Sequence, residues 1–85
     1  MGKRERLYQH IVMRRGDANV AFSDLCGLVK RLGFSCRIKG SHHIFWMEGV
    51  EEILNLQPNG AKAKAYQVGQ IRDVILKYRL ALGDE

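Results

Sequence analysis

The residues best suited to chemistry lie together in one short segment. Two cations, Arg37 and Lys39, precede a Gly-Ser step, and two adjacent histidines, His42 and His43, follow it. An imidazole with its ordinary pKa of about 6.5 can accept or donate a proton near neutral pH. Neighbouring cations can stabilise the negative charge that builds on phosphoryl oxygens. These groups predict cleavage of an RNA backbone: a base takes the proton of a ribose 2′-OH, that oxygen attacks the adjacent phosphorus, and an acid protonates the leaving oxygen.

The candidate site includes RNA contacts as well as the histidines. Lys62 and Lys64 lie in a later loop, where they can hold phosphates without reading sequence. The expected catalytic residues are His42 and His43, and the expected RNA-binding residues are Arg37, Lys39, Ser41, Lys62 and Lys64. No metal or cofactor is expected, because the chemistry requires none and the sequence lacks the carboxylate cluster of a two-metal nuclease.

Structural roles compete with this interpretation. Adjacent histidines in a strand are more often structural than catalytic, and Trp46 is expected in the core or at an interface. A non-catalytic RNA-binding module, in which cations hold the backbone and the histidines only pack, is one alternative. A small protein whose positive surface receives an acidic partner is another. Gly40 could mark a bulge that switches the alternation of side chains, so the sequence leaves open which histidine faces solvent.

Two helices are predicted before this segment. Residues 3–15 place Leu7 and Ile11 four apart, which predicts a short helix with one apolar stripe. Ser23 is a suitable N-cap for a second helix, and Gly33 is a suitable C′ residue at its end. The buried face of this second helix is predicted at Leu25, Leu28, Val29 and Leu32.

Three strands and a last helix are predicted next. Residues 34–39, 41–47 and 50–57 are rich in aromatic and β-branched residues and are separated by turns that contain glycine. A final helix over residues 66–80 has an apolar face at Val68, Ile71, Val74, Ile75 and Tyr78. Because the strands are consecutive, we predict an antiparallel meander with the helices on one face, an α+β two-layer domain.

Chain length and net charge restrict the classes of function that the protein can have. The 85 residues favour one small domain over a two-lobed enzyme with a deep cleft. Fourteen Lys and Arg against nine Asp and Glu give a formal charge of +5, which suits an anionic partner, nucleic acid before a membrane surface. No apolar run has the length of a membrane helix. Two cysteines, Cys26 and Cys36, indicate reduced thiols in a cytosolic protein.

Several blocks of the sequence, taken in order, are similar to the HicA toxin family, the YcfA-like proteins that form the mRNA-cleaving half of type II toxin–antitoxin pairs. The blocks are Phe22-Ser23-Asp24-Leu25-Cys26, Leu32-Gly33-Phe34, Arg37-Ile38-Lys39-Gly40-Ser41-His42-His43-Ile44-Phe45, Asn55-Leu56-Gln57-Pro58 and Ala63-Lys64-Ala65-Tyr66-Gln67-Val68-Gly69-Gln70-Ile71-Arg72. The most specific part is Gly40-Ser41-His42-His43, and the resemblance covers about residues 22–80.

The resemblance implies a fold like that of double-stranded-RNA-binding domains, α-β-β-β-α over residues 20–82, with residues 1–19 as a helical extension of the same domain. It implies a cytoplasmic, ribosome-independent endoribonuclease whose active histidine is His42 by position, with His43 second. The implied partners are mRNA and a HicB-like antitoxin protein that blocks the active histidine, and no membrane is implied. Two departures, Ala65 in place of a preferred proline and Gly69 near the start of the last helix, bear on the loop that carries the two later lysines.

Overall fold

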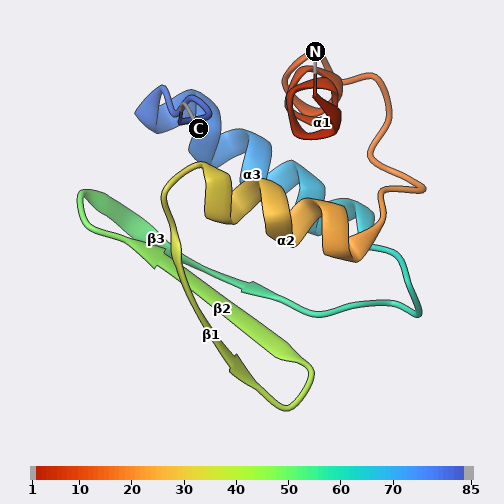
Figure 1. Ribbon diagram of the computed structural model, residues 1–85, viewed down its shortest axis with the longest axis vertical. Helices are drawn as coiled ribbons and strands as arrows, with labels where there is room; N and C mark the ends of the chain where they lie inside the picture. The colour runs from red at the N-terminus through yellow and green to blue at the C-terminus, as the bar shows by residue number, and fades with distance from the viewer. Residues whose placement is uncertain (1, 84–85) are drawn as a thin grey trace.

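The computed structural model describes residues 2–83, and the helices and strands follow the predicted order. Two helices come first, three strands follow, and one longer helix closes the chain (Figure 1). The elements are α1 (Lys3–Val12), α2 (Phe22–Arg31), β1 (Ser35–Lys39), β2 (His42–Met47), β3 (Val50–Leu56) and α3 (Ala65–Tyr78). Each lies within a few residues of its predicted range, and α3 continues through Gly69 without a break.

The three strands form one antiparallel sheet in the order β1-β2-β3. Helices α2 and α3 both lie on one face of this sheet, and α1, which contacts both of them, lies on the far side of that helical layer (Figure 1). The predicted α+β architecture, an antiparallel meander with helices on one face, is therefore confirmed. The described residues leave the opposite face of the sheet without a covering element, and we call it the open face.

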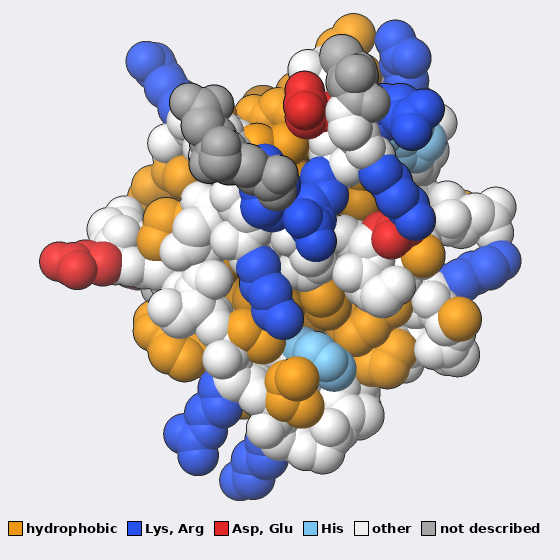
Figure 2. Space-filling model, in the orientation of Figure 1, with side chains coloured by type: hydrophobic (Ala, Val, Ile, Leu, Met, Phe, Trp, Pro, Cys, Tyr) orange, Lys and Arg blue, Asp and Glu red, His pale blue; other side chains and the backbone are white. Residues whose placement is uncertain are grey.

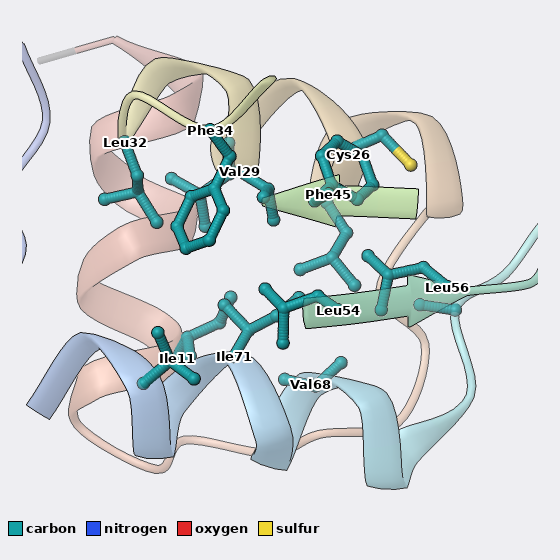
Figure 3. Close-up of a cluster of buried hydrophobic side chains, with 14 of the residues drawn as sticks. Ile11, Cys26, Val29, Leu32, Phe34, Phe45, Leu54, Leu56, Val68 and Ile71 are labelled. Carbon is teal, nitrogen blue, oxygen red and sulfur yellow. The ribbon is translucent and has the colours of Figure 1, made fainter. Parts of the chain in front are cut away.

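The core lies between the sheet and the two covering helices (Figure 3). Phe45 and Leu56 point from the sheet toward Val29 of α2 and Val68 of α3, and all four side chains are fully buried. The apolar faces predicted for both helices are buried, apart from Tyr78, which is half-buried. Ile11 brings α1 into the same core cluster. Burial of these stripes explains why the helical periodicity was a reliable signal.

The two ends of α2 differ in how well they were predicted. Ser23 is not the N-cap: the helix begins two residues earlier than such a cap implies, at Phe22, and Ala21 occupies the cap position without a side-chain hydrogen bond. The backbone N–H of Phe22 instead donates to the carbonyl oxygen of Ala61 at 3.0 Å. This carbonyl, distant in sequence, satisfies one of the N–H groups in the first turn of the helix that have no acceptor within the helix.

The C-terminal end of α2 closes as predicted. Gly33 has φ +109°, and its N–H donates to the carbonyl of Lys30. The next N–H, that of Phe34, donates to the carbonyl of Val29. This pair of bonds is the Schellman arrangement, which needs a residue that tolerates positive φ. Gly33 therefore ends the helix and turns the chain into β1.

A buried cation joins α1 to α3. The Arg72 side chain is almost fully buried; its Nε donates to the carbonyl of Ile11 at 2.8 Å and its Nη2 pairs with the carboxylate of Asp17. Tyr8, on α1, donates from its hydroxyl to the carbonyl of Leu80 at 2.7 Å. His10, also on α1, is half-buried, and its Nε2 lies 2.6 Å from the carbonyl oxygen of Gly16. Polar contacts thus fix α1 and the segment after it to the rest of the domain.

Replacing Arg72 should destabilise the fold. In Arg72→Met the carbonyl of Ile11 and the carboxylate of Asp17 lose a buried partner, so we expect the free energy of unfolding to fall by about 1–3 kcal/mol. Urea denaturation followed by circular dichroism measures this loss. Arg6→Met, an exposed position on α1, is the matched control and should change stability by less than about 0.5 kcal/mol. Equal stabilities of the two variants would contradict this role for Arg72.

The two cysteines should differ in reactivity. Burial, reinforced by the nearby Cys36 and opposed by Lys30, raises the pKa of Cys26 to about 11. The thiolate is the reactive species, so Cys26 should be nearly inert at pH 8, whereas the half-buried Cys36 should react first. Alkylation of the folded protein followed by mass spectrometry of its peptides tests this order. Alkylation of both at one rate without denaturant would contradict it.

Candidate active site

The β1–β2 hairpin decides which predicted residues lie together. Its turn has two residues, and Gly40 adopts φ +61°, a value that the first position of such a turn favours. Lys39 pairs with His42 across the turn, and Ile38 pairs with His43. Directly paired residues share a face of the sheet, and consecutive residues lie on opposite faces. The two histidines therefore lie on opposite sides of β2.

The open face gathers three of the predicted residues. Arg37 and Lys39 of β1 lie on this face with His42 of β2, and all three are exposed. The full set on this face is Ser35, Arg37, Lys39, His42, Ile44, Trp46, Glu51, Ile53 and Asn55. Basic side chains project from the end of the molecule formed by the β1–β2 hairpin (Figure 2). This face combines an imidazole with two fixed cations and no covering element.

A side chain from the third strand orients His42. The Oδ1 atom of Asn55 lies 3.1 Å from Nδ1 of His42. An amide oxygen only accepts, so Nδ1–H donates to it, and the lone pair of a neutral ring is then on Nε2. Asn55 was not among the predicted site residues. The sequence did contain a signal for Asn55: it is a polar residue between Leu54 and Leu56. This alternation places its side chain on the face of the sheet opposite the core.

His43 lies on the helical side of the sheet. Its ring meets the ring of Phe22 edge to face, with centroids 4.9 Å apart and planes at 80°. Its Nδ1 lies 3.3 Å from the carbonyl oxygen of Ser41, so this nitrogen is also the donor. His43 is half-buried, whereas His42 is exposed. The two imidazoles are both oriented, but they cannot reach one phosphate together.

The remaining predicted RNA contacts do not join the open face. Ser41 lies in the hairpin turn, where its hydroxyl accepts from the side chain of Gln57 at 3.0 Å. Lys62 donates to Oδ1 of Asn19 at 2.7 Å, and its backbone pairs with the start of α2. Lys64 is the N-cap residue of α3. The loop lysines thus belong to the helical side, with His43, rather than to the side of His42.

Most of the net positive charge lies elsewhere. Residues 3–15 hold five Lys or Arg and one Glu, so this segment carries +4 of the formal +5. The helix in this segment is separated from the sheet by the layer of α2 and α3 (Figure 1). A cavity of about 600 Å³ also lies on that side, lined by residues of α1, α2 and the C-terminal segment that include Lys3, Arg4 and Asp24. Neither feature adjoins the open face.

Comparison with models of protein families, with characterised proteins and with solved structures finds no match to this chain. Within residues 2–83, no group of three or more His, Cys, Asp or Glu side chains is arranged to hold a metal ion. No helix in the described part of the chain has the length and apolar character needed to cross a membrane.

The hydrogen bond between His42 and Asn55 predicts a tautomer. In long-range proton–nitrogen NMR spectra of the neutral rings, we expect His42 to be protonated at Nδ1 and unprotonated at Nε2. Asn55→Ala removes the acceptor and should move proton occupancy toward Nε2. His43 is an internal control, since its acceptor is a backbone carbonyl that the substitution leaves in place. A wild-type His42 protonated at Nε2 would contradict this geometry.

Proposed function

We propose that this protein is an endoribonuclease that cleaves mRNA without a metal ion, with His42 as the group that moves the proton. One observation carries the proposal: an exposed imidazole, oriented through Nδ1 by Asn55, stands directly across a strand pair from Lys39. A base with a free Nε2 beside a fixed cation is what transesterification of an RNA backbone requires.

The reaction follows from these positions. Nε2 of His42 accepts the proton of a ribose 2′-OH, and the resulting oxygen forms a bond to the adjacent phosphorus. The bond from phosphorus to the 5′ oxygen breaks, which leaves a 2′,3′-cyclic phosphate and a 5′-OH. Lys39 and Arg37 stabilise the added charge on the phosphoryl oxygens. The leaving oxygen takes its proton from water, because the second histidine faces the other side of the sheet.

The biological setting is proposed from the resemblance to the HicA family. The observed order of α2, three strands and α3 matches the α-β-β-β-α layout of double-stranded-RNA-binding domains, with α1 as an addition. In that setting the protein is the cytoplasmic toxin of a type II toxin–antitoxin pair. Its partner is a HicB-like antitoxin that blocks the histidine. The exposed position of His42 is compatible with such a block, since a protein seated on the open face would cover it.

A second candidate is a non-catalytic RNA-binding module of the same fold. The observation that favours it is the shape of the open face, which is a sheet surface rather than a cleft. Such a surface binds a polymer without excluding water from a reacting phosphate. This candidate predicts RNA binding that weakens with salt and no cleavage at any protein concentration. The two candidates therefore differ in one direct measurement.

Incubation of the purified protein with RNA tests the proposal. We expect cleavage products that end in a cyclic phosphate, formed equally with and without a chelator. His42→Ala should lower the rate by about 10²- to 10⁴-fold, the usual contribution of a general acid or base, while circular dichroism stays unchanged.

Two further histidine variants sharpen this test. His10→Gln changes a histidine on α1, far from the open face, and should retain full activity. His43→Gln should retain most of the activity, with some loss of stability because the contact with Phe22 is removed. If His43→Gln abolishes cleavage and His42→Ala does not, the active imidazole is on the helical side, near the loop lysines. Absence of cleavage by the wild-type protein would leave the binding module as the function.

A further inference from the structure

We infer that the open face binds single-stranded RNA, with a base of the substrate stacked on Trp46 a few nucleotides from the bond that His42 cleaves. The inference rests on the proposed function for the identity of the polymer. It adds the class of RNA, its path across the sheet and the residue that holds a base. Trp46 was expected in the core or at an interface; it is not in the core, because it is 42% exposed on the open face.

Apolar side chains on this face are exposed or only partly buried. Ile53, on the neighbouring strand, is 68% exposed, and Ile44 is half-buried between the two outer strands. A tryptophan and two isoleucines on one uncovered sheet surface form a patch of the kind that marks a binding site. A cation-bearing strand runs beside them, so the patch is not purely apolar. This combination suits a ligand with flat apolar groups on a charged backbone.

The register of β1 and β2 places Trp46, the two cations and His42 in order along the hairpin. Trp46 pairs with Ser35 at one end of the hairpin, Arg37 pairs with Ile44 in the middle, and Lys39 pairs with His42 beside the turn. Four residues along a strand separate Trp46 from His42, a distance of about 13 Å. An RNA strand laid along this path meets an aromatic ring first, then a guanidinium, then the ammonium and imidazole.

The flat shape of the surface selects single strands. In a duplex the bases are stacked and paired, and a side chain on a sheet cannot reach their faces. An unpaired base can turn outward and stack on an aromatic ring, as on other sheet surfaces that bind single-stranded nucleic acids. The proposed reaction has the same requirement, since the attacking 2′ oxygen must align with the bond that breaks. Stacking on Trp46 and cleavage at His42 thus favour the same substrate.

The charges on the face favour RNA over an acidic protein or a second copy. Arg37 and Lys39 provide two fixed positive charges, and Glu51, on β3, is the acidic residue that the described chain places there. Glu51 lies toward the β2–β3 turn, away from His42. A second copy of this chain would bring the same two cations against themselves. An acidic protein would satisfy the cations but has no group that stacks on Trp46 as every nucleobase does.

Trp46 is the one tryptophan of the chain, so its fluorescence reports directly on this position. The experiment uses the full-length His42→Ala variant, to prevent turnover, and titrates it with a single-stranded RNA oligonucleotide. The same RNA as a duplex, and inorganic polyphosphate, are the comparison ligands. We expect single-stranded RNA to quench the emission strongly, and the other two to bind with little quenching at equal saturation.

Substitutions test the energetic contribution of the ring. Trp46→Ala should weaken binding of single-stranded RNA by about 5- to 150-fold, the range found for loss of one base-stacking residue, and Trp46→Phe should recover part of the loss. Leu76→Ala removes an equally exposed apolar side chain on α3 and should have no effect. For charge, Arg37→Gln should weaken binding more than Arg15→Gln, a matched loss of one exposed cation on the far side of the molecule.

The outcomes separate this inference from the proposed function. The first outcome is that the wild-type protein cleaves RNA, but single-stranded RNA does not quench Trp46 and Trp46→Ala does not weaken binding. In that case the inference is overturned and the ribonuclease stands. If single-stranded RNA alone quenches Trp46 and no cleavage occurs, the inference stands and the ribonuclease is lost. Equal quenching by duplex RNA would overturn the assignment of substrate class. Emission that changes with protein concentration in the absence of RNA would instead identify a second copy as the occupant.

Discussion

The alternation of side chains across β2 is the constraint on which the site depends. His42 and His43 are consecutive in an extended strand, so they cannot face the same way. The two-residue turn then brings Lys39, rather than another residue, opposite His42. One imidazole and two cations share a surface as a result, and the second imidazole packs against Phe22. Any chemistry on the open face is therefore chemistry of a single histidine, oriented by an amide from the neighbouring strand.

The helical layer makes that surface possible. Phe45 and Leu56 anchor one face of the sheet in the core, which leaves the alternate positions of the same strands exposed. Three strands with one buried face are enough for independent stability. The buried pair of Arg72 and Asp17 fixes α1 to the other side of the helical layer. The fold is thus held from the side opposite the open face, and substitutions on that face can test function without removing the core.

Most of the net positive charge lies on the opposite side of the helical layer from the candidate site. The segment of residues 3–15 carries most of the net positive charge, yet it lies beyond α2 and α3 from the sheet. The molecule measures 31 × 29 × 23 Å, and electrostatic screening at physiological salt acts over about 8 Å. Charge on α1 therefore suits a general attraction for polyanions, while in the proposed reaction the contacts to the phosphate come from Arg37 and Lys39. Net charge alone would have pointed to α1 rather than to the open face.

The amino-acid sequence by itself determined the helices, the strands and their order, because apolar periodicity and the Gly33 helix end act within a few residues of chain. It also identified the hairpin segment as the one suited to proton transfer beside cations. Only the tertiary structure decided the rest. The first N–H of α2, that of Phe22, donates to the carbonyl oxygen of Ala61, almost forty residues away, and Asn55 reaches His42 from another strand. Arg37 and Lys39 are separated from Lys62 and Lys64 because these pairs lie on different layers. Such contacts join residues distant in sequence, and no local pattern specifies which side of a sheet they will share.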